Sequence, residues 1–207
     1  MNYPVTIPSL VQKWLYPRFT WKKPSFENKV YLTFDDGPHP EITPFVLDTL
    51  AAYQAKATFF CIGKNVAAYP EIYKRIIRDG HATGNHTYNH LNGWRTADAE
   101  YLKNVREAAA VIDSNLFRPP YGRITRFQAK LLMEKMGYKI IMWTVLSGDF
   151  DENLPGERCL ENVVKNTRPG SVVVFHDSEK AFKRLQFALP RTLEELSSRK
   201  NLLSELD

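Results

Sequence analysis

The residue types best suited to chemistry begin with two adjacent carboxylates, Asp35 and Asp36, which directly follow the apolar run that starts at Val30. Gly37 and Pro38 come next, a pair that is typical of a tight turn. Because adjacent carboxylates repel each other, the two acids require a cation, a shared proton or full solvation. Taken alone, an ordinary surface turn explains the pair better than an active site does, so the decision depends on residues further along the chain.

Two histidines, His86 and His90, are spaced four residues apart. On a helical turn this spacing places both imidazoles on one face, as metal ligands require. Together with Asp36 they offer two nitrogens and one oxygen with open positions for water, a set that suits zinc or a similar divalent ion. Hydrogen bonding within a loop, or a solvated turn, is the structural alternative for both histidines.

The elements that must position these residues alternate between strand and helix. Apolar and β-branched runs predict strands at 30–34, 57–62, 138–145 and 171–175. Helical spacing predicts helices at 43–54, 70–80, 96–115, 125–137, 156–166 and 189–198. Thr43 before Pro44 predicts one helix start, and Thr125 with Gln128 predicts a capping box at another. Near-continuous apolar strands alternating with helices predict a parallel sheet covered by helices.

Other polar residues fall where strands are expected to end, namely Arg118, Asp149 and His176. Catalytic groups of parallel barrels gather at the carboxyl ends of the strands. His176 could also be an ordinary core histidine, but the following Asp177 suggests a position near the surface of a cleft. The helix beginning at Pro70 is expected to bury one stripe, consisting of Ile72, Ile76 and Ile77.

Length and composition predict one domain with a substantial core, because the chain has 207 residues and 43% hydrophobic content. Residues 1–29 read as a lead-in, with helical turns within 9–15, packed on the surface of a domain spanning 30–207. The net charge of +5 is scattered, and no aromatic-basic motif resembles a nucleic-acid-binding module, so we expect no nucleic-acid partner. No run approaches the roughly 18 apolar residues of a membrane span. Without a recognisable signal peptide we expect a cytoplasmic location by default, with envelope association left open.

Several stretches taken together resemble a known family. Thr33–Pro38, His86–His90, Arg118–Gly122, Asp149 and His176 are similar, in order and spacing, to the motifs of the polysaccharide deacetylases with a NodB homology domain, carbohydrate esterase family 4. The resemblance runs from about residue 30 to 198. It implies an α/β fold, a distorted (β/α) barrel of seven or eight parallel strands, and hydrolysis of acetyl groups from N-acetylated sugars.

The resemblance also implies roles for individual residues. Asp36, His86 and His90 would hold a divalent metal ion, with Zn²⁺ expected and Co²⁺ or Ni²⁺ as alternatives. The catalytic groups would be Asp35 as general base, His176 as general acid, Arg118 orienting Asp35, Asp149 supporting His176, and the backbone of Tyr121 in an oxyanion hole. Substrate contacts would come from Pro120, Tyr121, Trp143, Phe150 and Val173.

Two departures from the family pattern bear on the acetyl pocket. Leu146 and Phe150 stand where the family often has Asp and Trp, and Val173 stands where it usually has Leu. These changes keep the pocket apolar and put substrate preference in question more than catalysis. His39 and His81 are not ligand positions in the family pattern and read as structural residues.

Three function classes follow. The leading one is a metal-dependent deacetylase acting on an N-acetylglucosamine-containing glycan, such as peptidoglycan or a chitooligosaccharide. Within the enzyme class, cleavage of O-acetyl esters of the xylan type is the alternative. The second class is a glycan-binding barrel without catalytic activity, against which all the filled catalytic positions argue. The third class is a basic nucleic-acid-binding protein, which leaves the set of Asp36, His86 and His90 unexplained.

Overall fold

The computed structural model describes residues 5–6, 16–24 and 26–207. The strands in chain order are β1 (Lys29–Asp35), β2 (Ala57–Cys61), β3 (Ala82–Asn85), β4 (Leu116–Phe117), β5 (Lys139–Ile140), β6 (Val145–Leu146), β7 (Val172–His176) and β8 (Leu202–Leu203). The helices are α2 (Ile42–Ala52), α3 (Gly63–Ala68), α4 (Pro70–Arg78), α5 (Asp98–Ala109), α6 (Arg126–Lys135), α7 (Gly156–Asn166) and α8 (Glu179–Ser198). A 3₁₀ turn covers Pro120–Gly122. None of the helices in this described part is both long and apolar enough to cross a bilayer.

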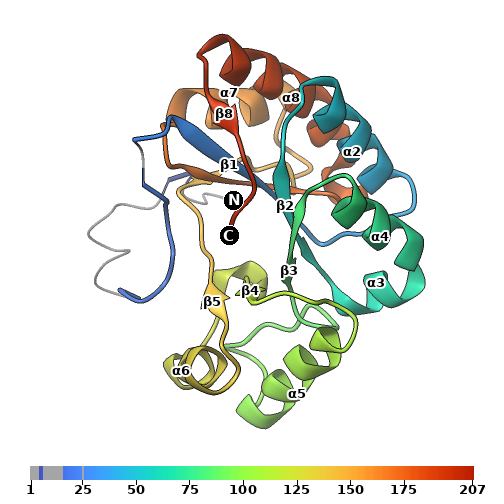
Figure 1. Cartoon of the computed structure of the whole chain (residues 1–207), viewed down its shortest axis with the longest axis vertical. Helices are drawn as coiled ribbons and strands as arrows, with labels where there is room; N and C mark the ends of the chain where they lie inside the picture. The colour runs from blue at the N-terminus through green and yellow to red at the C-terminus, as the bar shows by residue number, and fades with distance from the viewer. Residues whose placement is uncertain (1–4, 7–15, 25) are drawn as a thin grey trace.

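Seven of the strands form one curved sheet in the order β5-β4-β3-β2-β1-β7-β6, and each adjacent pair is parallel. The eighth, β8, lies off this path and pairs in parallel with the start of β1. This half-barrel, with its helices on the outer side (Figure 1), confirms the predicted distorted (β/α) barrel. The two edge strands, β5 and β6, are consecutive in the chain and are separated only by residues 141–144. Near these edges Thr20 bridges to Ile141 and Lys22 bridges to Ser171, so the described part of the lead-in lies against both sides of the opening.

Alternation along the strands separates the outer core from the barrel interior. Val30, Leu32 and Phe34 of β1 belong to the cluster that packs against the helices, whereas Tyr31 belongs to a second cluster with Phe60 of β2. Side chains of β1 therefore alternate between helices and interior. By the same two-residue period, Thr33 and Asp35 point to the interior side.

Helix boundaries agree with the sequence where local signals are strong. The capping box of Thr125 and Gln128 is formed at α6, and α7 spans the predicted range of 156–166. The predicted cap at Thr43 is wrong, because α2 begins at Ile42 and Thr43 donates its hydroxyl to Asp177. Residues 9–15, where helical turns are expected, lie outside the described residues.

Four other predictions differ from the structure. The strand expected at 138–145 is two short strands, because the chain passes there from one edge of the sheet to the other. The helix expected at 96–115 ends at Ala109, and the last helix begins ten residues early, at Glu179, with Pro190 inside it. Ile77 is half exposed, and α4 buries Tyr73 with Ile76 instead.

Candidate active site

The two adjacent carboxylates at the end of β1 differ in backbone position and in burial. Asp35 is the last residue of the strand and its side chain is buried, whereas Asp36 starts the turn with a positive φ of 84°. That backbone conformation is uncommon for a residue with a Cβ and is found where surrounding contacts impose it. One such contact is the Asn65 side-chain amide, which donates to the Asp36 carbonyl at 2.7 Å. The two carboxylates have different partners, because Asp35 accepts from Arg118 and Asp36 lies beside His86 and His90.

His86 and His90 are brought beside Asp36 by a loop, so the predicted helical turn is wrong. The loop contains two residues of positive φ, Thr87 and His90. Asn104 of α5 holds this loop in place. The side-chain oxygen of Asn104 accepts hydrogen bonds from the backbone N–H groups of Tyr88 and Asn89, both at 2.9 Å. The spacing of four residues still places both imidazoles together, by loop geometry instead of helical periodicity.

The three side chains meet closely enough to share one ion. Nε2 of His90 lies 3.2 Å from Asp36 Oδ1, and Nε2 of His86 lies 3.7 Å from the same oxygen. One ligand atom from each residue lies within 4.8 Å of the others. Nδ1 of His86 is 2.8 Å from the Arg118 carbonyl, to which it can only donate, so Nε2 of neutral His86 carries the free lone pair.

The electrostatics of this cluster fit a bound cation. Burial lowers the pKa of His86 to about 4, which leaves the imidazole neutral, as a ligand must be. Burial alone would raise the pKa of Asp36, but His90 and the charges of His176 and His86 outweigh it and lower the pKa. Asp36 Oδ1 is buried and has no well-aligned hydrogen-bond partner among the described residues. A buried carboxylate oxygen without a hydrogen bond, together with two nearby imidazole nitrogens, forms a set of ligand atoms suited to a divalent transition-metal ion.

Asp35 is held by a buried arginine. Nη1 of Arg118 donates to Asp35 Oδ1 at 2.7 Å and to the Thr33 hydroxyl, also at 2.7 Å. Its other nitrogens donate to the carbonyls of Ile141 and Met142, and its guanidinium lies 4.1 Å above the Phe60 ring. Arg118 is fully buried. Its charge is therefore compensated by Asp35, and the carboxylate is fixed in one orientation.

Asp149 and His176 form a second buried pair. Asp149 accepts two hydrogen bonds at 2.7 Å from His176, one from the backbone N–H and one from Nδ1 of the ring. Burial lowers the pKa of His176, but the charge of Asp149 and this hydrogen bond dominate and raise it to about 10. Parallel pairing places His176 directly opposite Asp35 on the neighbouring strand. The acid–base candidates thus share one end of the sheet.

The turn Pro120–Gly122 borders the metal cluster. Tyr121 has a φ of 60° and its ring centroid is 4.6 Å from that of His90, while 61% of the residue is exposed. Pro119 and Pro120 have no N–H, so Tyr121 supplies the first backbone donor of this turn.

The remaining expected substrate contacts lie at different depths. Pro120 is buried, and Trp143 and Phe150 are partly buried, with the Phe150 ring 5.4 Å from His176. Val173 is fully buried in the helix-facing core cluster, on the opposite face of β7 from His176. Its side chain therefore faces the outer helices and not the space beside His176.

Asp177 is a residue beside the site to which the sequence analysis gave no role. It is buried and accepts hydrogen bonds from the Thr43 hydroxyl and from the Gly37 N–H at 3.0 Å, whereas His176, expected near the surface of a cleft, is partly exposed. A Cβ on Gly37 would lie 2.0 Å from an Asp177 oxygen, so only glycine fits. Burial raises the pKa of Asp177 to about 8. The sequence shows only that an acidic residue follows His176. Its hydrogen-bond partners lie more than a hundred residues away along the chain, so its burial could not be predicted.

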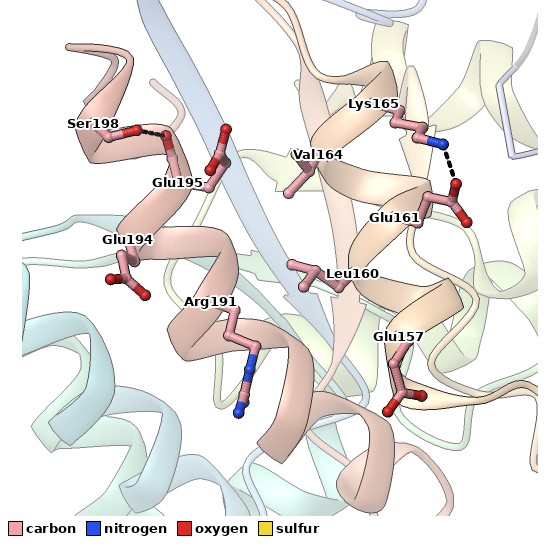
Figure 2. A pocket seen from close by; sticks show the side chains of 9 residues that line it. All are labelled: Glu157, Leu160, Glu161, Val164, Lys165, Arg191, Glu194, Glu195 and Ser198. Atoms are coloured by element: carbon pink, nitrogen blue, oxygen red, sulfur yellow. Dashed lines mark hydrogen bonds and ion pairs between the residues drawn. The ribbon is translucent and has the colours of Figure 1, made fainter.

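A separate groove lies between α7 and α8 and shares no residue with the metal cluster (Figure 2). Leu160 and Val164 of α7 line it together with Glu194 and Arg191 of α8. Its Glu161 is paired with Lys165 of the same helix. The groove contains no histidine or cysteine, and we assign no chemistry to it.

Comparisons with known proteins agree with this geometry. The family model described as Polysaccharide deacetylase matches residues 22–141, a range that contains the whole Asp36–His86–His90 cluster. A peptidoglycan-N-acetylglucosamine deacetylase of Bacillus cereus is 37% identical over 195 residues, 90% of this chain and 91% of that protein. A chitooligosaccharide deacetylase of Azorhizobium caulinodans is 36% identical over 162 residues, 73% of this chain and 74% of that protein. A crystal structure of a peptidoglycan N-acetylglucosamine deacetylase superposes with a TM-score of 0.85 at 30% identity, covering 93% of each chain.

Proposed function

This chain belongs to the polysaccharide deacetylase family, and on that premise we propose that it hydrolyses the acetamido group of N-acetylglucosamine units in a glycan. The observation that carries the proposal is the meeting of three groups at one end of the sheet. The three groups are the Asp36–His86–His90 cluster, the Asp35–Arg118 pair and the Asp149–His176 pair. Their residues lie at the ends of β1 and β7 or in the segments that directly follow β1, β3, β4 and β6.

We propose that Asp36, His86 and His90 hold a divalent cation, with Zn²⁺ favoured by the two imidazoles and one carboxylate and with Co²⁺ or Ni²⁺ as substitutes. When bound, such an ion lowers the pKa of water towards about 7 and polarises a carbonyl oxygen. The protein's own contribution would be the three ligand side chains of Asp36, His86 and His90. The Arg118 carbonyl, which accepts from His86, keeps the ligand nitrogen of that ring facing the cluster.

Asp35 acts as the general base in this proposal. It accepts a proton from the water that attacks the acetyl carbonyl carbon, while Arg118 keeps the carboxylate oriented towards that water. The carbonyl oxygen gains negative charge as the tetrahedral intermediate forms. In this proposal the backbone N–H of Tyr121 donates to that oxygen, which is supported by the proximity of the Tyr121 ring to His90.

His176 acts as the general acid. Its Nδ1 is bonded to Asp149, so Nε2 is the nitrogen that passes a proton to the departing amine as the carbon–nitrogen bond breaks. The products are acetate and a free amino sugar. The pKa of His176, raised to about 10, keeps the ring protonated at neutral pH and ready for this step.

Two single substitutions test the division of labour between the adjacent carboxylates. Asp35→Asn should retain the metal and lose about 10²–10⁴-fold in rate, the usual contribution of a general base. Asp36→Asn should lose the metal itself, because it removes the only anionic ligand of the cluster. Metal content by mass spectrometry and acetate release are measured for both, with the exposed Glu152→Gln as control. Full activity of Asp35→Asn would remove the general-base role.

The substrate class is tested with a panel. N-acetylchitooligosaccharides, peptidoglycan and acetylated xylan are offered side by side to the zinc-loaded and cobalt-loaded protein. Acetate from the first two supports the proposal, and acetate from xylan alone assigns an O-acetyl esterase. Binding of glycans without release of acetate from any of them identifies a non-catalytic barrel and refutes the enzyme.

A further inference from the structure

An exposed tryptophan, four residues after His90, is held in a fixed position. Trp94 is 60% exposed, yet its indole N–H donates to the Ile124 carbonyl at 3.0 Å. The preceding residue, Gly93, donates its N–H to the Arg123 carbonyl at 3.1 Å, and a Cβ there would lie 2.6 Å from that oxygen. The backbones at Gly93 and Arg123 are therefore in close contact, and the hydrogen bond to Ile124 fixes the orientation of the exposed Trp94 ring.

The side chain of Arg123 lies over the Trp94 ring, and its charge is not paired with a carboxylate of the described chain. Its guanidinium carbon lies 5.4 Å from the centre of the Trp94 ring, a cation–π contact. Within the described chain no hydrogen bond or ion pair engages the Arg123 guanidinium, although the residue is partly buried. Arg95 lies in the loop 91–97, and Arg126 is the first residue of α6. Asp98, at the end of that loop, accepts hydrogen bonds from Thr125 and Gln128, so these two neighbouring segments carry three arginines and one carboxylate. The local field therefore favours an anion.

Both loops are continuous with the candidate active site. Trp94 follows the cluster residue His90 by four positions, and Arg123 follows Tyr121 by two, which limits the Cα–Cα separation of the latter pair to about 7 Å. The rings of His90 and Tyr121 are themselves 4.6 Å apart. A glycan whose N-acetyl group lies at the cluster would place an adjoining sugar along these loops.

We propose that Trp94 and Arg123 form a subsite for the sugar next to the one that is deacetylated, and that this subsite selects a glycan carrying a carboxylate. The indole face stacks on the apolar face of the sugar ring, as aromatic side chains do with flat, partly apolar partners. The guanidinium pairs with the carboxylate, for which its planar fork is suited. This subsite rests on the proposed deacetylase function and narrows its substrate to acidic N-acetylated glycans over neutral ones.

Binding is measured first, without turnover. The protein is stripped of metal with a chelator and titrated calorimetrically with an N-acetylglucosamine–N-acetylmuramic acid tetrasaccharide, whose lactyl groups are carboxylates, and with the same tetrasaccharide converted to primary amides. Wild type should bind the acid about tenfold more tightly than the amide, a typical gain for one charge-assisted hydrogen bond. Arg123→Gln should abolish this preference, and 0.5 M salt should reduce it. Trp94→Ala should weaken both ligands by a similar factor.

The control is Arg106→Gln, which removes the same charge from an exposed position on α5 and should leave the preference unchanged. Metal-loaded proteins are then compared by kcat/KM on the same pair of glycans. Equal binding of acid and amide by wild type overturns the subsite. An equal loss for both ligands in Arg123→Gln, or binding of a single-stranded oligonucleotide as tight as that of the acidic glycan, also overturns it.

The two proposals fail separately. If no glycan releases acetate but the chelated protein still prefers the acid in an Arg123-dependent manner, the subsite stands and the deacetylase function is wrong. If acetate is released equally from both glycans and by Arg123→Gln as by wild type, the function stands and the subsite is wrong.

Discussion

The pair of Asp149 and His176 gives the sharpest single test of the proposed chemistry. Asp149→Asn keeps the size of the side chain but removes its charge and replaces one of its two acceptor oxygens with a donor. Both of those oxygens now accept a hydrogen bond at 2.7 Å from His176. The substitution therefore removes the interaction that opposes the effect of burial on the imidazole.

The magnitude follows from the titration of His176. With Asp149 its pKa is about 10. Without that charge and its hydrogen bond, burial is opposed only by Asp36 and Asp35, so the pKa should fall towards the ordinary histidine value of about 6.5. If the pKa falls that far, the protonated fraction at pH 7.5 drops from nearly all to about 10%. Any rate that needs protonated His176 should then fall by up to about tenfold at that pH, and the alkaline limb of the pH–rate profile should move down by up to about 3 pH units.

The same pair makes a prediction about stability. A histidine whose pKa is raised by folding contributes stability that is complete below its unfolded pKa, about 6.5, and is lost as the pH rises towards 10. Asp149→Asn should therefore be more destabilising at pH 6 than at pH 9.5, as measured by chemical unfolding of the chelated protein. This readout does not depend on activity.

The assay is acetate release between pH 5 and 10 at matched metal content, with Glu152→Gln as a control from the same loop. A bound cation repels protonated His176 and lowers its pKa in every variant, so the displacement between two profiles is the quantity to compare. Superimposable alkaline limbs of wild type and Asp149→Asn would refute the role of His176 as an acid supported by Asp149.

Three further predictions concern residues around the site. Burial lowers the pKa of His81 to about 4, so below pH 6.5 the unfolded chain binds more protons than the folded one. Between pH 7.5 and pH 5 the free energy of unfolding of the chelated wild type, measured with urea, should therefore fall by about 2 kcal/mol more than that of His81→Asn. Equal pH dependence of the two proteins would contradict this. Gly37→Ala would place its Cβ against the Asp177 carboxylate, so it should lower the free energy of unfolding by about 2–3 kcal/mol and weaken metal binding. The control Gly137→Ala meets nothing within 4 Å, so it should lower the free energy of unfolding by only about 1 kcal/mol, for its positive φ. Asn104→Ala should weaken metal affinity about tenfold in a calorimetric titration, because two N–H groups of the histidine loop lose their acceptor, and unchanged affinity would remove this role.

The local sequence determined the elements whose signals lie within a few residues. The capping box of Thr125 and Gln128 needs only one turn of helix, and α7 spans its predicted range. The apolar run ending in Asp35 and Asp36 likewise predicted a strand that delivers two acids to a turn. These features depend on side chains and backbone groups that are neighbours along the chain, so they can be read before the fold is known.

Features that depend on partners far along the chain could not be predicted. Thr43 has the type and position of a helix cap, but Asp177, 134 residues away, recruits its hydroxyl and the helix starts elsewhere. Residues 138–145 have the composition of one strand, but they must connect the two edges of the curved sheet and are interrupted. In both cases a tertiary contact outweighs a local preference of about 1 kcal/mol.

The set of candidate site residues was thus determined by the sequence, and their mutual geometry by the tertiary structure. Spacing selected Asp36, His86 and His90, but a loop braced by Asn104 brings them together, and no helix does. The two carboxylates are adjacent in the sequence and of the same type, and only the resemblance to the family gave them different expected roles. The parallel register of β1 and β7, which places Asp35 opposite His176, and the burial of Arg118 against Asp35 make them different. Such register and burial arise only when strands distant in the chain pack into one sheet, which is why the structure was needed to assign them.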